Sequence, residues 1–149
     1  RPTINLGFSG NGRMEAEVAS LLAELDPCVF VIDCLPNMNE TTVSNRTIPL
    51  IKKLREAHYK TPILLVEDRS FTNTPFFPSR KIHHHKSRTA LKKAYIELND
   101  SGVGNLYYLD GDHLLGHDGE AATDGSHPND LGMVRYADAY EPVLRSMLK

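Results

Sequence analysis

The sequence predicts an α/β fold built on a parallel sheet with helices on both of its faces. Short apolar runs alternate along the chain with longer segments in which apolar residues recur every three or four positions. Strands and helices that alternate in this way form parallel sheets, because each helix carries the chain back to begin the next strand. With 149 residues, 40% hydrophobic and 24% charged, the chain is long enough to bury one core, and we expect one domain over residues 1–149.

Each expected element follows from its own pattern. The strands are short apolar runs, and the helices are amphipathic. In the second helix, Ile51 and Leu54 belong to one apolar stripe, and in the last helix a stripe runs from Leu131 through Val134 to Leu144. In chain order, we expect a strand over Thr3–Leu6, a helix over Arg13–Leu25, a strand over Cys28–Asp33, a helix over Asn45–His58, a strand over Pro62–Val66, a helix over His85–Leu98, a strand over Leu106–Leu109 and a helix over Asn129–Leu148 that Pro142 kinks.

A polar segment before the last helix carries the clearest sign of chemistry. Asp124 stands three residues before His127, and Pro128 follows the histidine and stiffens the turn. A carboxylate at this spacing can hold one imidazole nitrogen and leave the other to act as a base, which is two thirds of a hydrolytic triad. The plain alternative is a turn in which Asp124 caps backbone amides and His127 is a surface residue before the helix.

Two further residues stand where α/β sheets carry their chemistry, just beyond the C-terminal ends of strands. Gly10 follows the first expected strand, and Asn37 follows the second. A glycine N–H and a side-chain amide are the donors that hold a developing oxyanion during acyl transfer. Each residue alone is explained by a turn or a loop cap. Together with Asp124 and His127, in this chain order, they indicate a hydrolase.

These residues resemble the SGNH hydrolases, also called GDSL-type esterases and lipases. The segment around Gly10 resembles the second sequence block of that family, and the segment that ends at Asn37 resembles the third. Asp124, with Gly125 after it, and His127, with a proline after it, resemble the last block. The resemblance implies a three-layer α/β/α sandwich whose sheet is flavodoxin-like, with strand order 2-1-3-4-5.

The same resemblance implies a role for each site residue. His127 is the expected base, Asp124 orients it, and the Gly10 N–H and the Asn37 amide form the oxyanion hole. The family carries its nucleophilic serine in an earlier block, on the first strand of the sheet, and we find no such block in these residues. We therefore expect the serine to lie on an upstream segment of the same polypeptide, and the isolated chain to be inactive.

Three residues of the chain are weaker nucleophile candidates. Ser9 lies in a segment that misses the G-x-S-x-G pattern at its last position, where Asn11 stands. Ser126 lies between the aspartate and the histidine, too close to them in sequence for in-line geometry. Cys34 stands near the expected site, but a reactive thiol needs a lowered pKa, and a buried thiol is the simpler interpretation.

No metal or cofactor is expected. His83, His84 and His85 are consecutive, so their imidazoles point in different directions on a helix or a strand. His113 and His117 have a ligand-like spacing, but the glycines around them indicate a loop. A nucleotide-binding domain is disfavoured, because the early glycines do not follow the order G-x-G-x-x-G.

Charge and composition limit the partners. A formal net charge of −2 gives no reason to expect nucleic-acid binding, and no apolar run is long enough to span a membrane.

The long segment Glu67–Lys81 contains three phenylalanines, which could wall a pocket, dock onto a neighbouring domain or fold onto their own domain. Asp68 and Arg69 within it are interpreted as a surface ion pair. Localisation and oligomeric state stay open.

The function that we expect is that of a serine esterase acting on a short acyl ester or a carbohydrate ester. The alternative from another class is a binding module that keeps the fold and the pocket but has no nucleophile. The acyl group and the alcohol of the substrate cannot be read from the sequence.

Overall fold

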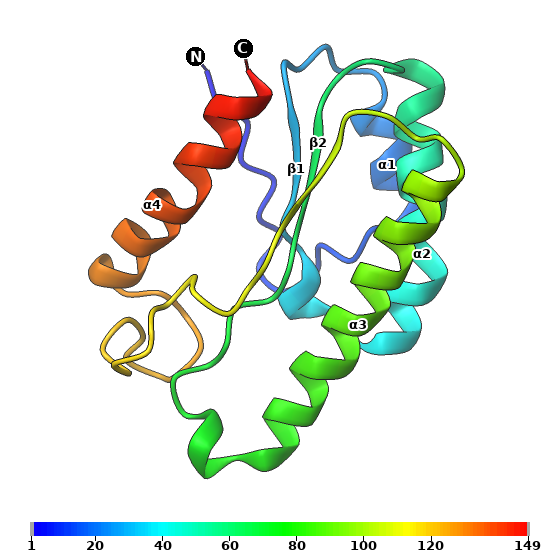
Figure 1. Cartoon of the computed structure of the whole chain (residues 1–149). Coiled ribbons are helices and arrows are strands. Elements are labelled where there is room, and N and C mark those ends of the chain that lie inside the picture. Colours follow the sequence, from blue (N-terminus) through cyan, green and yellow to red (C-terminus); the bar gives the residue numbers. More distant parts are fainter. Residues whose placement is uncertain (1, 149) are drawn as a thin grey trace.

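The computed structural model describes residues 2–148 and has the predicted α/β class. A three-stranded parallel sheet lies between helices, with α4 on one side of it and α1, α2 and α3 on the other (Figure 1). The elements are α1 (Ala16–Leu22), β1 (Phe30–Ile32), η1 (Leu35–Asn37), α2 (Glu40–Ala57), β2 (Ile63–Val66), η2 (Thr74–Phe76), α3 (Pro78–Asp100), β3 (Leu106–Leu109) and α4 (Asp130–Met147).

The strands pair in the order β1-β2-β3, all parallel, as the flavodoxin-like order implies for these three segments. Ile63 of β2 lies opposite Phe30 of β1 and Leu106 of β3, so the three strands start and end at nearly the same level. All four residues of β2 are buried, which explains their continuous apolar pattern. Because the pairing is parallel, the C-terminal ends of the strands share one edge of the sheet.

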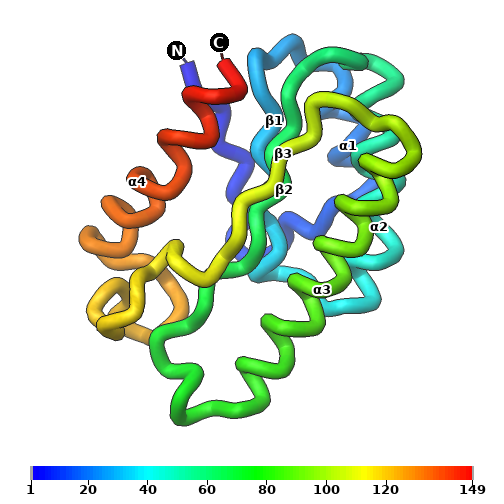
Figure 2. Tube along the Cα trace, viewed as in Figure 1, coloured from blue at the N-terminus to red at the C-terminus, as the bar shows by residue number. Residues whose placement is uncertain are grey.

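Each face of the sheet has its own core. On one face, Ile32, Ile63 and Leu65 pack with Ile51 and Leu54 of α2 and with residues of α1 and α3. On the other face, Leu64 and Val66 pack against α4. Successive side chains of β2 point to opposite faces of the sheet, so this one strand contributes to the core on both faces. The Cα trace in Figure 2 shows the two helical layers on either side of the strands.

Two helices begin with the same type of cap. The side chain of Asn39 accepts a hydrogen bond from the Thr42 N–H at 2.9 Å, and Asn129 accepts one from the Gly132 N–H at 3.0 Å. Asparagine at this position satisfies an N–H that the helix itself leaves unpaired. Within residues 2–148, none of the helices combines the length and the apolar character that a membrane span requires.

Several predicted bounds were wrong. The segment Thr3–Leu6 is not a strand, because no other described strand lies beside it to complete a ladder, and Ile4 is 66% exposed. The helix expected from Asn45 begins at Glu40, where Asn39 caps it. The helix expected from His85 begins at Pro78, since proline is well suited to the first turn of a helix.

The predicted apolar stripe of α4 was wrong in its first half. Leu131 is 43% exposed and Val134 is 57% exposed, so neither covers the sheet. The face that packs on Leu64 and Val66 includes Leu144 of the predicted stripe, together with Tyr136, Ala139, Tyr140, Val143 and Met147. The helix continues through Pro142.

The α2 core contact gives a first prediction. Leu54 is fully buried between α2 and the sheet, so Leu54→Ala should lower the free energy of unfolding by about 2–5 kcal/mol, through lost burial and the cavity that remains. Urea unfolding followed by circular dichroism measures this change. Leu21→Ala is the control, because Leu21 of α1 is 62% exposed and its truncation should cost less than about 1 kcal/mol. Equal losses in the two variants would contradict the packing described.

Candidate active site

A hollow of about 510 Å³ opens at the edge of the sheet where β1 and β2 end. It collects residues from four separate parts of the chain, namely the loop before α1, the end of β1, the end of β2 and the turn before α4. Parallel sheets place ligand sites at this edge. The lining residues are Ser9, Gly10, Asp33, Pro36, Asn37, Arg69 and His127.

The structure brings Asp124 and His127 together in one tight turn. Oδ2 of Asp124 lies 2.6 Å from Nδ1 of His127, and Oδ1 accepts the backbone N–H groups of Ser126 and His127, both at 2.8 Å. The turn is closed by an antiparallel bridge between Ala122 and Pro128. Asp124 therefore does both things that the sequence allowed, because it caps backbone amides with one oxygen and holds the imidazole with the other.

Three hydrogen bonds set the charge state of this carboxyl group. The imidazole of His127 and the two backbone N–H groups together hold the pKa of Asp124 well below its usual range. A carboxylate that stays ionised keeps a proton on Nδ1 of His127, so the lone pair of the neutral ring is on Nε2. The ring of His127 is the part of the turn that lines the hollow, and its side chain is 81% exposed.

Gly10 and Asn37 lie on the same hollow as His127. Gly10 has a φ of +83°, a conformation that glycine adopts without strain, and a Cβ added there would meet no atom within 4 Å. Asn37 ends the short helix η1, and its side-chain nitrogen donates to the Gly12 carbonyl oxygen at 3.2 Å. An amide nitrogen carries two N–H groups, so this bond occupies one of them.

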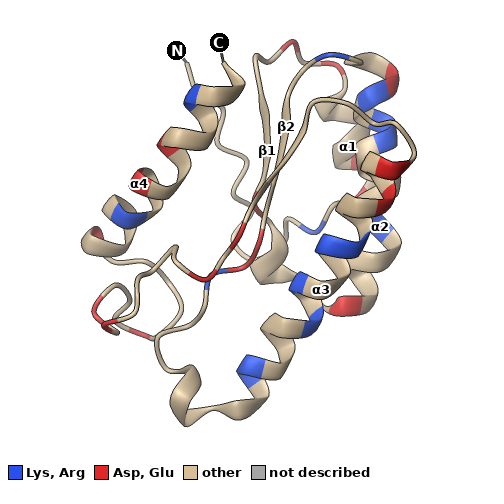
Figure 3. Ribbon diagram, in the orientation of Figure 1, with Lys and Arg blue, Asp and Glu red and all other residues tan. Residues whose placement is uncertain are grey.

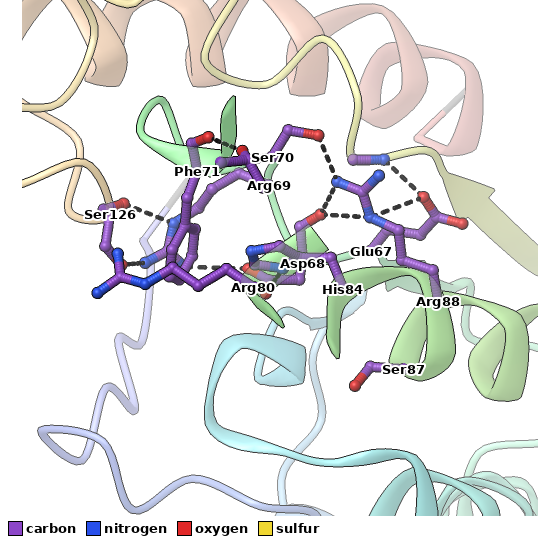
Figure 4. Close-up of polar contacts among 12 residues, drawn as sticks. Glu67, Asp68, Arg69, Ser70, Phe71, Arg80, His84, Ser87, Arg88 and Ser126 are labelled. Atoms are coloured by element: carbon purple, nitrogen blue, oxygen red, sulfur yellow. Dashed lines mark hydrogen bonds and ion pairs between the residues drawn. The ribbon is translucent and has the colours of Figure 1, made fainter. Parts of the chain in front are cut away.

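Arg69 is a lining residue that the sequence analysis missed. The expectation of a surface pair was wrong, because Arg69 is 8% exposed and Asp68 only 1%. Arg69 donates from Nε to the Ser126 carbonyl oxygen at 2.8 Å and from a terminal nitrogen to Ser126 Oγ at 2.9 Å (Figure 4). The signal available in the sequence was position, since three charged residues follow a fully apolar strand directly.

The segment after β2 holds the turn that carries His127. Besides Arg69, the Thr72 N–H donates to the Gly125 carbonyl oxygen at 2.9 Å. Gly125 has a φ of +84°, and a Cβ there would lie 2.1 Å from the Asn73 side chain, so only glycine fits. Of the phenylalanines, Phe71 packs on His84 at 4.3 Å, whereas Phe76 is 80% exposed and is not among the lining residues.

Asp33 contributes an unusual carboxyl group to the hollow. Asp33 is an exposed residue that lines the hollow, but the protein around its carboxyl group displaces part of its hydration, and this desolvation raises its pKa to about 6. Tyr140 of α4 donates its hydroxyl proton to Asp33 Oδ2 at 2.6 Å, which lowers the pKa, and the nearby Arg69 lowers it further. This hydrogen bond ties the residue after β1 to α4, the helix that covers one face of the sheet alone.

Acidic residues collect at the edge where the strands end (Figure 3). Asp33, Glu67 and Asp110 each follow one of the three strands. Arg88 of α3 neutralises part of this charge, because it pairs with Glu67 at 3.6 Å and with Asp112, and donates to the Asp68 carbonyl oxygen. A buried carboxylate without such partners would cost several kcal/mol, roughly, so the arginines are needed to keep this edge folded.

The other candidate residues fit catalysis less well. Burial raises the pKa of Cys34 to about 12, which disfavours the thiolate. Ser126 Oγ is occupied by Arg69, while Ser9 lines the hollow with a φ of +49°. Within residues 2–148, no group of three or more histidine, cysteine, aspartate or glutamate side chains is arranged to hold a metal, and His113 and His117 contact each other at 2.8 Å.

A family model supplies the classification that the geometry suggests. The model of the GDSL-like lipase/acylhydrolase family matches residues 1–145, which is nearly the whole chain. The chain belongs to this family. No curated protein sequence matches it.

Solved structures agree with the family. A protein of Bacteroides ovatus, assigned as a GDSL-like lipase, is 36% identical, with a TM-score of 0.93 over 97% of this chain and 43% of its own. Salicylyl-acyltransferase SsfX3, from a tetracycline biosynthetic pathway, is 18% identical, with a TM-score of 0.77 over 94% of this chain and 44% of its own, and shows a shared fold. The chain of this GDSL-family protein thus spans less than half the length of either structure.

The Asp33–Tyr140 contact gives a second prediction. The Asp33 carboxyl carbon should titrate near pH 6 in a carbon-13 NMR experiment, compared with its usual 3.8. Tyr140→Phe should move the midpoint higher, because a hydrogen bond that favours the carboxylate is lost. In the unmodified protein, the raised pKa means that the folded state binds the Asp33 proton more tightly than the unfolded chain does. The contribution of Asp33 to the free energy of unfolding therefore falls as pH rises from about 4 to about 6. A midpoint near 4 in the unmodified protein would contradict this environment.

Proposed function

We propose that this GDSL-family protein is a serine esterase that hydrolyses carboxylic esters by a Ser-His-Asp mechanism. The observation that carries the proposal is the meeting of four groups. The imidazole of His127, held by Asp124, lines the same hollow as Gly10 and Asn37, although the four residues span more than a hundred positions of the chain. The nucleophilic serine is supplied by an upstream segment of the same polypeptide.

The proposed reaction has two halves. The serine oxygen attacks the ester carbonyl while Nε2 of His127 takes the serine proton, and the carbonyl oxygen becomes an oxyanion. The Gly10 N–H and the Asn37 amide donate to that oxyanion. Collapse of the tetrahedral intermediate breaks the bond to the alcohol, which leaves with the proton from His127. Water then repeats the sequence on the acyl-serine and releases the acid.

The composition of the hollow supports a short acyl group or a carbohydrate ester as the substrate. Pro36 is the single apolar side chain among the lining residues, the other side chains offer hydroxyl, carboxyl, amide, guanidinium and imidazole groups, and Gly10 offers its backbone. A long acyl chain gains its binding energy from apolar surface, about 25 cal/mol per Å² removed from water, and this lining supplies little of it. Polar groups that converge on a small hollow instead suit the hydroxyls of a sugar.

Two measurements test the reaction class. The full-length protein should hydrolyse a nitrophenyl ester of a short acid, and a fluorophosphonate probe should label one serine, which peptide mass mapping locates. Labelling on a peptide upstream of Arg1 supports the proposal. If the folded, full-length protein neither labels nor hydrolyses any ester in a panel, the proposal fails, and a binding module with the same fold becomes the better description.

The proposed base gives a third prediction. His127→Ala should lower kcat by more than about a thousandfold, because it removes the imidazole, held by Asp124, that is proposed to take the serine proton. Steady-state kinetics on the nitrophenyl ester measure the change. His85→Ala is the control, because His85 is an exposed residue of α3 outside the hollow and its loss should leave kcat within about twofold. A loss of tenfold or less in His127→Ala would exclude this role.

The proposed oxyanion hole gives a fourth prediction. Asn37→Ala should lower kcat by about a hundredfold to a thousandfold, with a much smaller effect on KM, because the amide donates to charge that develops only in the transition state. The matched control is Asn99→Ala on the exposed side of α3, where the amide donates to a helix carbonyl at 2.9 Å. A variant of Asn37 that changes KM alone would assign the amide to substrate binding instead.

A further inference from the structure

A buried arginine that lines the hollow joins the end of β2 to the turn that carries His127. Arg69 reaches across 57 positions of sequence to bind Ser126, the residue directly before His127. The guanidinium donates from Nε to the backbone carbonyl oxygen at 2.8 Å and from a terminal nitrogen to the hydroxyl oxygen at 2.9 Å. Two neighbouring donors of one planar group therefore fix both the backbone and the side chain of one residue.

Other buried side chains hold the Arg69 guanidinium in place. Asp68 lies 3.5 Å from a terminal nitrogen of Arg69, and both side chains are less than a tenth exposed. The second carboxyl oxygen of Asp68 contacts Nδ1 of His84 at 2.6 Å. The ring of Phe71 lies 5.2 Å from the guanidinium carbon and 4.3 Å from the His84 ring. Figure 4 shows these side chains in one continuous group that ends at Ser126.

The start of the turn is packed, because Ala121 and Ala122 are buried with Leu115 and Tyr136, but the side chains of Asp124 and His127 are not. The side chains of Asp124 and His127 are 56% and 81% exposed, so apolar contacts contribute little to their position. Internal hydrogen bonds give the turn its shape, and the buried alanines hold its start, while contacts with the segment after β2 hold its tip. Those contacts are the Arg69 bonds to Ser126, the Thr72 N–H bond to Gly125 at 2.9 Å, the Asn73 amide bond to the Asp124 carbonyl oxygen at 3.4 Å and the close approach of Asn73 to Gly125.

We propose that Arg69 is a positioning residue for His127. Its guanidinium, held in place by buried Asp68 and His84, donates two hydrogen bonds to Ser126 and so places His127 over the hollow. The inference rests on the proposed role of His127 as the base. Arginine suits this task because its nitrogen atoms form a rigid planar fork, whereas lysine ends in a single point charge on a flexible chain. A displacement of a catalytic group by about 1 Å can cost about a hundredfold in rate.

Arg69→Lys is the variant that separates position from stability. The lysine keeps a positive charge beside the buried Asp68, so the ion pair is retained while the two-point grip is lost. In the full-length protein we expect kcat on the nitrophenyl ester to fall about thirtyfold to a hundredfold, while KM changes less than about threefold. Ser126→Ala removes one of the two acceptors and should lower kcat by a smaller factor, in the same direction.

The matched control is Arg135→Lys. Arg135 of α4 also grips the long connection before α4, through the Leu115 carbonyl oxygen and Asp118, both at 2.7 Å, but it does not line the hollow. This variant should leave kcat within about twofold. Thermal unfolding of all three variants checks that each is folded at the assay temperature. If Arg69→Lys is not folded, Ser126→Ala decides the question, because it leaves the buried Arg69–Asp68 pair intact.

The outcomes separate this inference from the proposed function. If His127→Ala abolishes turnover but the folded Arg69→Lys and Ser126→Ala keep the parent kcat, Arg69 has no positioning role and the esterase assignment stands. If KM rises in Arg69→Lys while kcat is unchanged, Arg69 binds substrate and the positioning role is excluded. If His127→Ala itself keeps its activity, the proposed function fails first, and a loss in Arg69→Lys then cannot be ascribed to the base.

Discussion

Parallel pairing of three short strands decides where Asp33, Asn37 and Arg69 of the candidate site lie. Because β1, β2 and β3 start and end at nearly the same level, the residues that follow them come to one edge of the sheet. Asp33, Asn37 and Arg69 reach the hollow in this way, and the turn before α4 closes over it from the far side of the sheet. A strand out of register would separate these residues. The correct pairing of the strands is therefore a precondition for every contact between them in the site.

Charge at that edge has to be compensated. Glu67 and Asp68 are almost completely buried, and carboxylates in such a place are tolerated only with partners. Glu67 accepts bonds from the Tyr108 hydroxyl at 2.6 Å and the Gly111 N–H at 2.9 Å, while Asp68 has Arg69 and His84. These bonds tie the segment after β2 to α3, to β3 and to the loop after β3, and Arg69 extends the connection to Ser126 in the turn of His127. The residues that partner the buried carboxyl groups are thus also the residues that assemble the site.

Local patterns predicted much of the fold. Leu106–Leu109 was expected as a strand with the bounds that the structure has, and the stripe of Ile51 and Leu54 faces the core as expected. The segment Thr3–Leu6 has the composition of a strand but is not one in residues 2–148, since a strand exists only with a neighbour to share its hydrogen bonds. Leu131 and Val134 have helical spacing, yet they face away from the sheet, because the position of α4 on the sheet selects which side is covered.

The sequence by itself determined the class of the fold, the family and the Asp124–His127 pair, because each depends on a local pattern. These patterns are the alternating periodicity, the residue spacing that resembles a family block, and a carboxylate three residues from an imidazole. Only the tertiary structure decided that Arg69 is buried and grips Ser126, and that Asp33 pairs with Tyr140 across 107 positions. No spacing rule relates residues so far apart. Their contacts, and the desolvation that raises the Asp33 pKa, exist only once the sheet and its helices have brought these segments together.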